Sequence, residues 1–176
     1  MMDYVTNSYY EMCETFYSKR AKKFRAGLYG ASDHVAQGYT TPATPDGRAN
    51  PDPIADAASP VQARDFNGPT AVLTSSLHYH QEHFIDGVAL NIKIHPNVLS
   101  REDGKAKLRD MTKAYLDNGG LEVQYNIVSS EQMREAQKHP DDYHDMVVRI
   151  AGYSAYFVEL NTDQQNDLIA RTENVI

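Results

Sequence analysis

The chain has 176 residues, the length of one ordinary domain or of part of a larger one. Its 24 acidic side chains outnumber 17 lysines and arginines, so the net charge of −7 disfavours binding to nucleic-acid phosphates. The single cysteine, Cys13, excludes an internal disulfide, and no apolar run reaches the roughly 20 residues that cross a bilayer. The first ten residues lack a secretory pattern, so we expect a soluble cytoplasmic protein that binds neither nucleic acid nor membrane.

The N-terminal 26 residues (1–26) are predicted to form an amphipathic helix. Apolar side chains recur there at spacings of four, three and four, which is the pattern of one helical stripe. The stripe consists of Val5, Tyr9, Met12 and Phe16. Five basic residues between positions 19 and 25 follow it, and we expect them at the C-terminal end of the helix, where they favour the helix dipole. The remainder, 27–176, is predicted to be one further domain.

A long proline-rich loop is predicted at 38–70. It contains six of the eight prolines and two turn signals, Pro45-Asp46-Gly47 and Asn67-Gly68. Loops of this length inside a compact domain are usually functional or disordered. Because its low-complexity character is weak, we expect an ordered loop that lies against another part of the protein.

The segments that follow alternate between strand and helix patterns, which predicts a mixed α/β fold. One strand is predicted to begin at 71–73, and another covers 87–94, where apolar and polar residues alternate. A helix from the N-cap candidate Ser100 is expected to stop at Asn118-Gly119-Gly120, because glycine favours a left-handed C-cap. The next predicted strand, 121–127, alternates in the same way.

Two capping boxes predict the starts of two further helices. Ser129 with Gln132 has the required spacing, and the helix that it opens is expected to end before the next proline. Thr162 with Gln165 has the same spacing and opens a predicted C-terminal helix (161–176).

The histidines and the cysteine are candidates for metal binding and for nucleophilic chemistry. On a strand, His78 and His80 would face the same side as a usable metal pair, with His83 close by. Spacing identifies no third ligand, so ordinary structural histidines are the alternative and no metal is assigned. Cys13 has acidic neighbours, unlike a low-pKa thiolate, and is expected to be a half-buried structural thiol.

Gly152 interrupts a run of strand-forming residues. The segments on either side, 147–150 and 156–158, are predicted strands, and a glycine between them weakens a strand by roughly 0.5–1 kcal/mol relative to alanine. Taken alone, this glycine indicates a bulge or a tight bend.

The motifs around Gly152 resemble the signature of the glycyl radical enzymes. The central motif is Arg149-Ile150-Ala151-Gly152-Tyr153. Further motifs agree in the same order between about residue 24 and residue 176: Thr44-Pro45-Asp46-Gly47-Arg48, Asn67-Gly68-Pro69-Thr70-Ala71-Val72-Leu73, Gly119-Gly120-Leu121-Glu122-Val123-Gln124-Tyr125-Asn126 and Pro140-Asp141-Asp142-Tyr143. The segment 154–160 looks more like the dehydratase and lyase branch than the pyruvate formate-lyase branch. The fold that this implies is the C-terminal part of the family's α/β barrel, completed by a partner chain.

The resemblance implies a radical stored on the α-carbon of Gly152. With no Cβ, the centre can flatten between an electron-donating amide nitrogen and an electron-withdrawing carbonyl, so the backbone itself acts as the cofactor. By resemblance, no other cofactor is bound, and a separate activating enzyme with S-adenosylmethionine and an iron–sulfur cluster installs the radical. The family also implies backbone cleavage at Gly152 in air, and hence the cytoplasm or a bacterial microcompartment of an anaerobic organism.

The resemblance also suggests which residues serve the radical loop (145–160) and the substrate. The expected loop supports are Arg149, Ala151, Tyr153 and Ser154. The expected lining on one side of a pocket for a small-molecule substrate is Pro69, Thr70, Ala71 and Val72.

One family feature is not carried over. Members pass the radical to a cysteine far upstream, commonly in Cys-x-Glu, whereas Cys13 is followed by Glu14 and Thr15 and lies on a different element. We therefore expect a small subunit without turnover of its own, which serves a large cysteine-containing partner in radical C–O, C–N or C–S bond cleavage. Decarboxylation of an aryl acetate is a further reaction type. A spare part for an oxygen-cleaved enzyme and a fragment of a longer enzyme are the alternatives.

Overall fold

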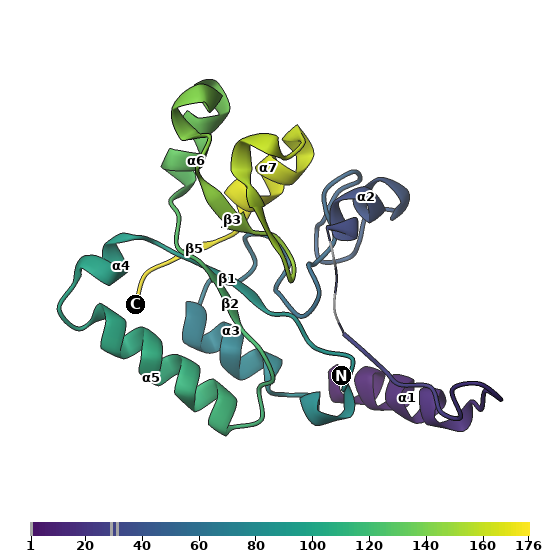
Figure 1. The fold of residues 1–176 in the computed structure, drawn as a ribbon. Coiled ribbons are helices and arrows are strands. Elements are labelled where there is room, and N and C mark those ends of the chain that lie inside the picture. Colours follow the sequence, from purple (N-terminus) through teal and green to yellow (C-terminus); the bar gives the residue numbers. More distant parts are fainter. Residues whose placement is uncertain (1, 29, 31) are drawn as a thin grey trace.

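The computed structural model describes residues 2–28, 30 and 32–176. At its centre lies a three-stranded parallel sheet in the order β2-β1-β5, built from β1 (Asn91–Ile94), β2 (Gln124–Asn126) and β5 (Glu173–Asn174) (Figure 1). All four residues of β1 are buried, as is typical of the central strand of a parallel sheet. The chain therefore mixes helices and strands, as the sequence predicts.

Two helices cover one face of this sheet. They are α3 (Pro69–Ser76) and α5 (Gly104–Asp117), and the short α4 (Asn97–Ser100) leads from β1 into α5 (Figure 1). The buried core of this layer consists of Val72, Leu73, Leu90, Ile92, Ile94, Val98 and Tyr115. Burial of each large apolar side chain contributes roughly 1.5–3 kcal/mol, so this core holds the sheet against the helices.

A separate antiparallel hairpin lies on the other side of the sheet. Its strands are β3 (Val147–Arg149) and β4 (Ser154–Tyr156), with α6 (Ser130–Lys138) and α7 (Thr162–Ala170) beside them (Figure 1). The 3-10 helices η2 (Pro140–Tyr143) and η3 (Phe157–Glu159) lead into and out of the hairpin. This layer has a core of its own, made of Met133, Ala136, Val148, Phe157 and Leu168.

The proline-rich loop is ordered around a buried arginine. It runs from 41 to 68, because residues 38–40 belong to α2 (Asp33–Thr40) and residues 69–70 to α3. The guanidinium of Arg48, which is 5% exposed, donates to the carbonyls of Ala49, Asp52 and Thr41 at 3.1, 2.6 and 2.9 Å. Gln62 also bonds to Asp167 of α7. The loop therefore lies against α7, as expected from its sequence.

The N-terminal helix is shorter than predicted and turned about its axis. Helix α1 (Met2–Thr15) ends 11 residues before the predicted end at 26, so the basic residues at 19–25 lie beyond it. The predicted apolar stripe is exposed: Val5 is 59% and Met12 55% accessible. Tyr10 and Cys13 pack onto the body instead, and Tyr10 stacks on His83 with ring centroids 4.1 Å apart. Cys13 is half-buried, as predicted.

Four further expectations need correction. Of the strand predicted at 156–158, only Tyr156 lies in a strand (β4), because residues 157–159 form the 3-10 helix η3. Residues 71–73 are helical rather than a strand, because Gly68 and Pro69 begin α3 with proline at its first position. Helix α5 begins after Asp103, and Ser100 instead ends α4. Asn161 caps α7 in place of Thr162, and the helix stops at Ala170, so the predicted helix at 161–176 ends in strand β5.

Several local signals are confirmed. Ser129 and Gln132 form the predicted capping box, and α6 ends before Pro140. Gly119 has φ +97° at the end of α5. The strands predicted at 87–94, 121–127 and 147–150 appear in shortened form as β1, β2 and β3. Among the described residues, no helix combines the length and the apolar character needed to span a membrane.

Candidate functional site

Gly152 lies in the tight turn that joins β3 and β4. The N–H of Ile150 donates to the carbonyl of Tyr153 at 2.9 Å, so Ala151 and Gly152 are the two central residues of the turn. Gly152 has φ +82°, the value that a type II turn requires at this position and that favours glycine. A Cβ built on Gly152 would meet no atom within 4 Å. The α-carbon is therefore exposed, and packing does not explain the glycine.

Two amide side chains of β2 hold the hairpin against the central sheet. Asn126 accepts from the backbone N–H of Arg149 at 2.7 Å and donates to the carbonyl of the same residue at 2.6 Å. Gln124 accepts from the N–H of Gly152 at 3.3 Å. Residues two apart on a strand face the same side, so both amides point at the hairpin.

Arg149 braces the turn from its own strand. Its Nε donates to Oε1 of Gln124 at 3.0 Å, and its Nη1 donates to the hydroxyl of Ser154 at 3.2 Å. Because both groups that face Oε1 of Gln124 are donors, the amide oxygen and not the amide nitrogen points toward them. Arg149 and Ser154 thus lie in contact at the loop, where the sequence places them as supports.

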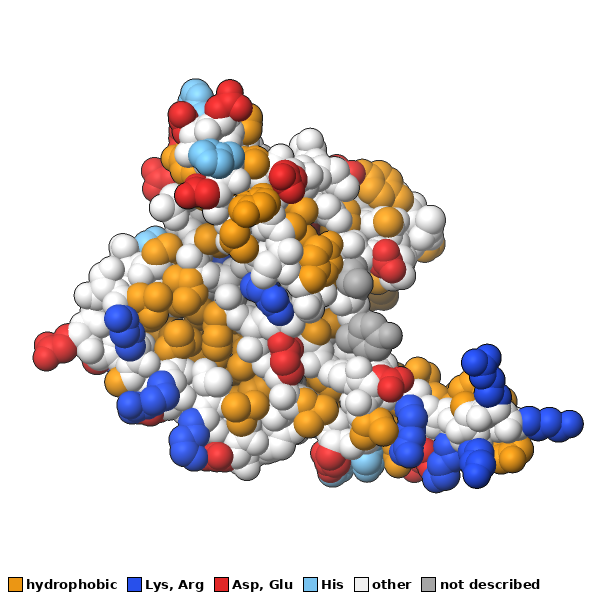
Figure 2. Space-filling model, viewed as in Figure 1, with side chains coloured by type: hydrophobic (Ala, Val, Ile, Leu, Met, Phe, Trp, Pro, Cys, Tyr) orange, Lys and Arg blue, Asp and Glu red, His pale blue; other side chains and the backbone are white. Residues whose placement is uncertain are grey.

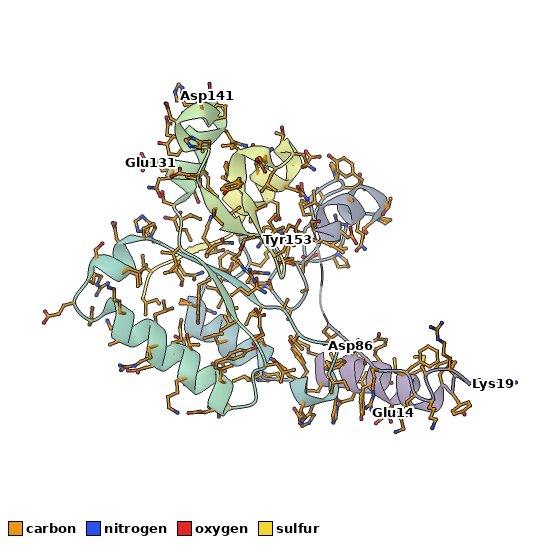
Figure 3. All side chains as sticks on the ribbon, in the orientation of Figure 1. Glu14, Lys19, Asp86, Glu131, Asp141 and Tyr153 are labelled. Carbon is orange, nitrogen blue, oxygen red and sulfur yellow. The ribbon has the colours of Figure 1, made fainter. Side chains whose placement is uncertain are left out.

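The other two expected supports contribute less through their side chains. Ala151 is 3% exposed and is buried at the turn. Tyr153 provides the carbonyl that closes the turn, whereas its side chain is 40% exposed at the end of the hairpin (Figure 3). An accessible aromatic side chain beside Gly152 is available to a neighbouring polypeptide.

A buried charge cluster holds the base of the loop. Nη1 of Arg171 donates to the carbonyl of Ile150 at 3.1 Å and lies 3.4 Å from Asp56, while Nη2 bonds to Asp167 at 2.8 Å. His34 also contacts Asp167, with 3.0 Å between Nε2 and Oδ2. The cluster joins α2, the proline-rich loop and α7 to the loop at 145–160.

The two carboxylates of this cluster have opposite pKa shifts. Burial raises the pKa of Asp56, although the nearby charge of Arg171 opposes this. Burial acts in the same direction on Asp167, but its hydrogen bond to His34 and the charge of Arg171 together lower its pKa. The hydrogen bond to His34 and the charge of Arg171 thus favour the ionised form of Asp167, whereas burial disfavours the ionised form of Asp56.

The predicted pocket residues 69–72 lie in the first turns of α3. Pro69 and Val72 are buried, Thr70 is exposed and Ala71 is partly buried. Val72 lines a polar cavity of about 20 Å³ together with Arg171, Asn91 and Lys93. This volume is enough for about one water molecule. Ala71 and Val72 also line an open hollow of about 280 Å³, together with Phe66 and Gly68.

The remaining candidates lie elsewhere. Cys13 lies in α1 and packs on the cluster that contains Tyr79 and Phe84. The loop is held instead by Gln124 of β2 and by Arg171, which directly follows α7. His78 and His80 lie in and after the turn that follows α3 rather than on a strand. Within the part of the chain that the structure describes, no three His, Cys, Asp or Glu side chains are grouped so that they could hold a metal.

Several residues that hold the loop have no role among the expectations from the sequence. Gln124 and Asn126 were part of a matching motif, and their spacing of two on a strand is the signal that they act on one neighbour. Arg171 lies within the matching region that extends to residue 176. His34, Asp56 and Asp167 carried no local signal, because their partners are distant in the sequence.

Comparisons with known proteins show the family. The Glycine radical family model matches residues 54–158, more than half of the chain, and the chain belongs to this family. It is 44% identical over 154 residues to the protein named "Probable dehydratase YbiW" of Escherichia coli K12. It is 38% identical over 164 residues to the 4-hydroxyphenylacetate decarboxylase glycyl radical subunit of Clostridioides difficile. These matches cover 87% and 93% of this chain but only 19% and 18% of the relatives.

Solved structures agree on the fold. The B12-independent glycerol dehydratase of Clostridium butyricum matches 99% of this chain with a TM-score of 0.94 and 37% identity. Hydroxyproline dehydratase of Clostridioides difficile matches with the same TM-score at 31% identity. In each case the chain corresponds to 22% of the larger protein, so its α/β fold is the C-terminal part of a glycyl radical enzyme barrel. The chain thus spans about a fifth of the length of these relatives.

Proposed function

We propose that the chain is the radical-bearing small subunit of a split glycyl radical enzyme, with the radical on the α-carbon of Gly152. The observation that carries the proposal is the exposed turn in which Gly152 has φ +82° and open space where a side chain would lie. A hydrogen-abstracting group can reach this carbon. Gln124 and Arg171 meanwhile keep the turn in place.

The proposed chemistry is a chain of hydrogen-atom transfers. A separate activating enzyme, which cleaves S-adenosylmethionine at an iron–sulfur cluster, removes one hydrogen atom from Gly152 and leaves an unpaired electron on its α-carbon. That carbon takes a hydrogen atom from a cysteine thiol of the large partner, so the C–H bond re-forms and the sulfur holds the unpaired electron. The sulfur then takes a hydrogen atom from the substrate.

The relatives suggest the reaction class. They include proteins named as dehydratases, a decarboxylase subunit and isethionate sulfite-lyases. For this chain we propose cleavage of a C–O, C–N or C–S bond after the substrate hydrogen has been removed. Most residues that select the substrate belong to the partner, because this chain spans only about a fifth of a complete enzyme.

Exposed apolar side chains provide surface for such a partner. Val147, Tyr153 and Tyr156 are 40–53% exposed on the hairpin. The apolar stripe of α1 is also exposed, and Figure 2 shows basic side chains gathered where this helix ends. Apolar area also lies over α5, where Leu99, Leu108 and Tyr125 line an open hollow (Figure 2). Several exposed apolar areas on one chain are typical of an interaction surface.

Anaerobic co-purification tests the subunit assignment. The chain carries an affinity tag, is expressed in its source organism without oxygen, and captured chains are identified and counted by mass spectrometry. The proposal expects one large cysteine-containing chain per copy, without a C-terminal glycine motif of its own. A captured chain that retains such a motif would indicate instead that this protein is a spare part for an oxygen-cleaved enzyme. Recovery without any companion would contradict both assignments.

A further inference from the structure

The hydrogen bond between Gly152 and Gln124 involves the atom next to the proposed radical carbon. Oε1 of Gln124 receives the Gly152 N–H at 3.3 Å and Nε of Arg149 at 3.0 Å. Two donors therefore share one acceptor. The inference below rests on the proposed function, because it matters only if Gly152 carries the radical.

The amide nitrogen of Gly152 is the electron-donating partner of an α-carbon radical. A hydrogen bond from its N–H to an oxygen polarises the N–H bond and leaves more electron density on the nitrogen. This stabilises the adjacent radical centre and also keeps the peptide plane in the orientation that delocalisation needs. Arg149 draws density from the same oxygen, so its charge limits how strongly Gln124 accepts.

We propose that Gln124 is a positioning residue that stabilises the stored radical through the N–H of Gly152. Its neighbour Asn126 has a different role: it makes two hydrogen bonds to the backbone of Arg149, three residues before Gly152. Asn126 therefore docks the hairpin, and Gln124 adjusts the electronic surroundings of the radical carbon. The two amides offer a matched pair of variants that separates docking from stabilisation.

The first measurement needs no radical. In the unactivated chain, nuclear magnetic resonance gives the rate at which the Gly152 amide proton exchanges with solvent. Q124M keeps an unbranched chain of similar length but removes the strong acceptor, and the amide should exchange faster. Q124E keeps an acceptor and should retain protection. Q137M removes an amide on α6 that bonds to Gln165 and Asn166, and it should leave the Gly152 exchange rate unchanged.

The second measurement uses the activated chain. Electron paramagnetic and electron–nuclear double resonance give the coupling of the exchangeable amide proton, and the loss of signal after addition of dithiothreitol gives a quenching rate constant. Q124M should shift the coupling and raise the rate constant roughly fivefold, the factor that about 1 kcal/mol represents. Q124E should return both the coupling and the quenching rate constant to their wild-type values. N126L should lower the radical yield but leave the coupling at its wild-type value.

The outcomes separate the two proposals. A wild-type doublet whose coupling and quenching rate are unchanged in Q124M would overturn the role of Gln124 alone. Equal amide exchange in the wild type and Q124M would overturn it as well. Absence of any doublet in the wild-type chain would overturn the proposed function, and this inference with it.

Discussion

Asn126 lies on β2 of the central sheet, and Arg149 lies on β3 of the hairpin. The side chain of Asn126 connects the two sheets, because its amide bonds to the backbone of Arg149 as a neighbouring strand would. Its amide bonds to both the N–H and the carbonyl of Arg149, at 2.7 and 2.6 Å. The hairpin that carries Gly152 is thus attached to the central sheet through side chains, of which Asn126 makes the shortest contacts. Gln124 and Arg171 add one bond each to the turn itself.

Replacing Asn126 should destabilise the protein. N126L leaves the partly buried N–H and carbonyl of Arg149 without their side-chain partner, and each lost bond costs about 1 kcal/mol, more where a group stays unsatisfied. We expect the free energy of unfolding to fall by about 2–3 kcal/mol in urea titrations. N118A removes an exposed amide that bonds only within its own helix end, and should change stability by no more than about 0.5 kcal/mol. Equal stability of both variants would contradict the docking role of Asn126.

The buried amine of Lys93 should make stability depend on pH. Burial lowers the pKa of Lys93 to about 8 from the ordinary 10.5, although its ammonium donates to Ser130 and to the α7 carbonyls of Leu168 and Ile169. Above pH 8 the unfolded chain therefore binds more protons at this group than the folded chain. The unfolding free energy of the wild type should then rise relative to that of K93M between about pH 8 and pH 10.5.

Parallel urea titrations of the wild type and K93M at several pH values check this. Tyrosines also titrate in that range, but their contribution is common to both chains and cancels in the difference. A difference in unfolding free energy that stays flat or falls with rising pH would show that Lys93 does not have a lowered pKa.

The exposed stripe of α1 should affect association rather than folding. Val5 and Met12 are each more than half exposed, so V5K and M12E should leave the unfolding free energy within about 0.5 kcal/mol of the wild type. The same changes should weaken capture of the large partner, because charged groups would then face an apolar contact. K138A, at an exposed ion pair on α6, serves as the control for a change of surface charge. Undiminished capture by V5K and M12E would exclude this face from the interface.

The sequence predicted those parts of the fold that depend on near neighbours. The Ser129–Gln132 capping box and the glycine stop after α5 involve residues within one turn of each other, and both are found as expected. The strand predicted at 71–73 is wrong, because a short apolar run fits a buried helix as well as a strand. Pro69, at the first position of α3, is the local signal that favours the helix.

The candidate site was only partly predictable for the same reason. The signature around Gly152 is contiguous and could be read directly. The contacts that hold it are not: Asn126 and Arg149 are 23 residues apart, and His34 and Asp167 are 133 apart. The buried face of α1 was predicted wrongly. Tyr10 and Cys13 are buried because they contact an aromatic cluster that is distant in the sequence, and they do not belong to the regular apolar stripe of the helix.

The central claim is tested most directly by the electron paramagnetic resonance spectrum of the chain after anaerobic incubation with its activating enzyme, partner and S-adenosylmethionine. Three chains are compared: the wild type, G152A and G119A. Gly119 also has a positive φ, +97°, and open space around its Cβ position, so G119A carries the same strain of about 1–2 kcal/mol at another site. We expect a glycine-type doublet in the wild type and in G119A, and none in G152A. A doublet that persists in G152A, or no doublet in the wild type, would contradict it.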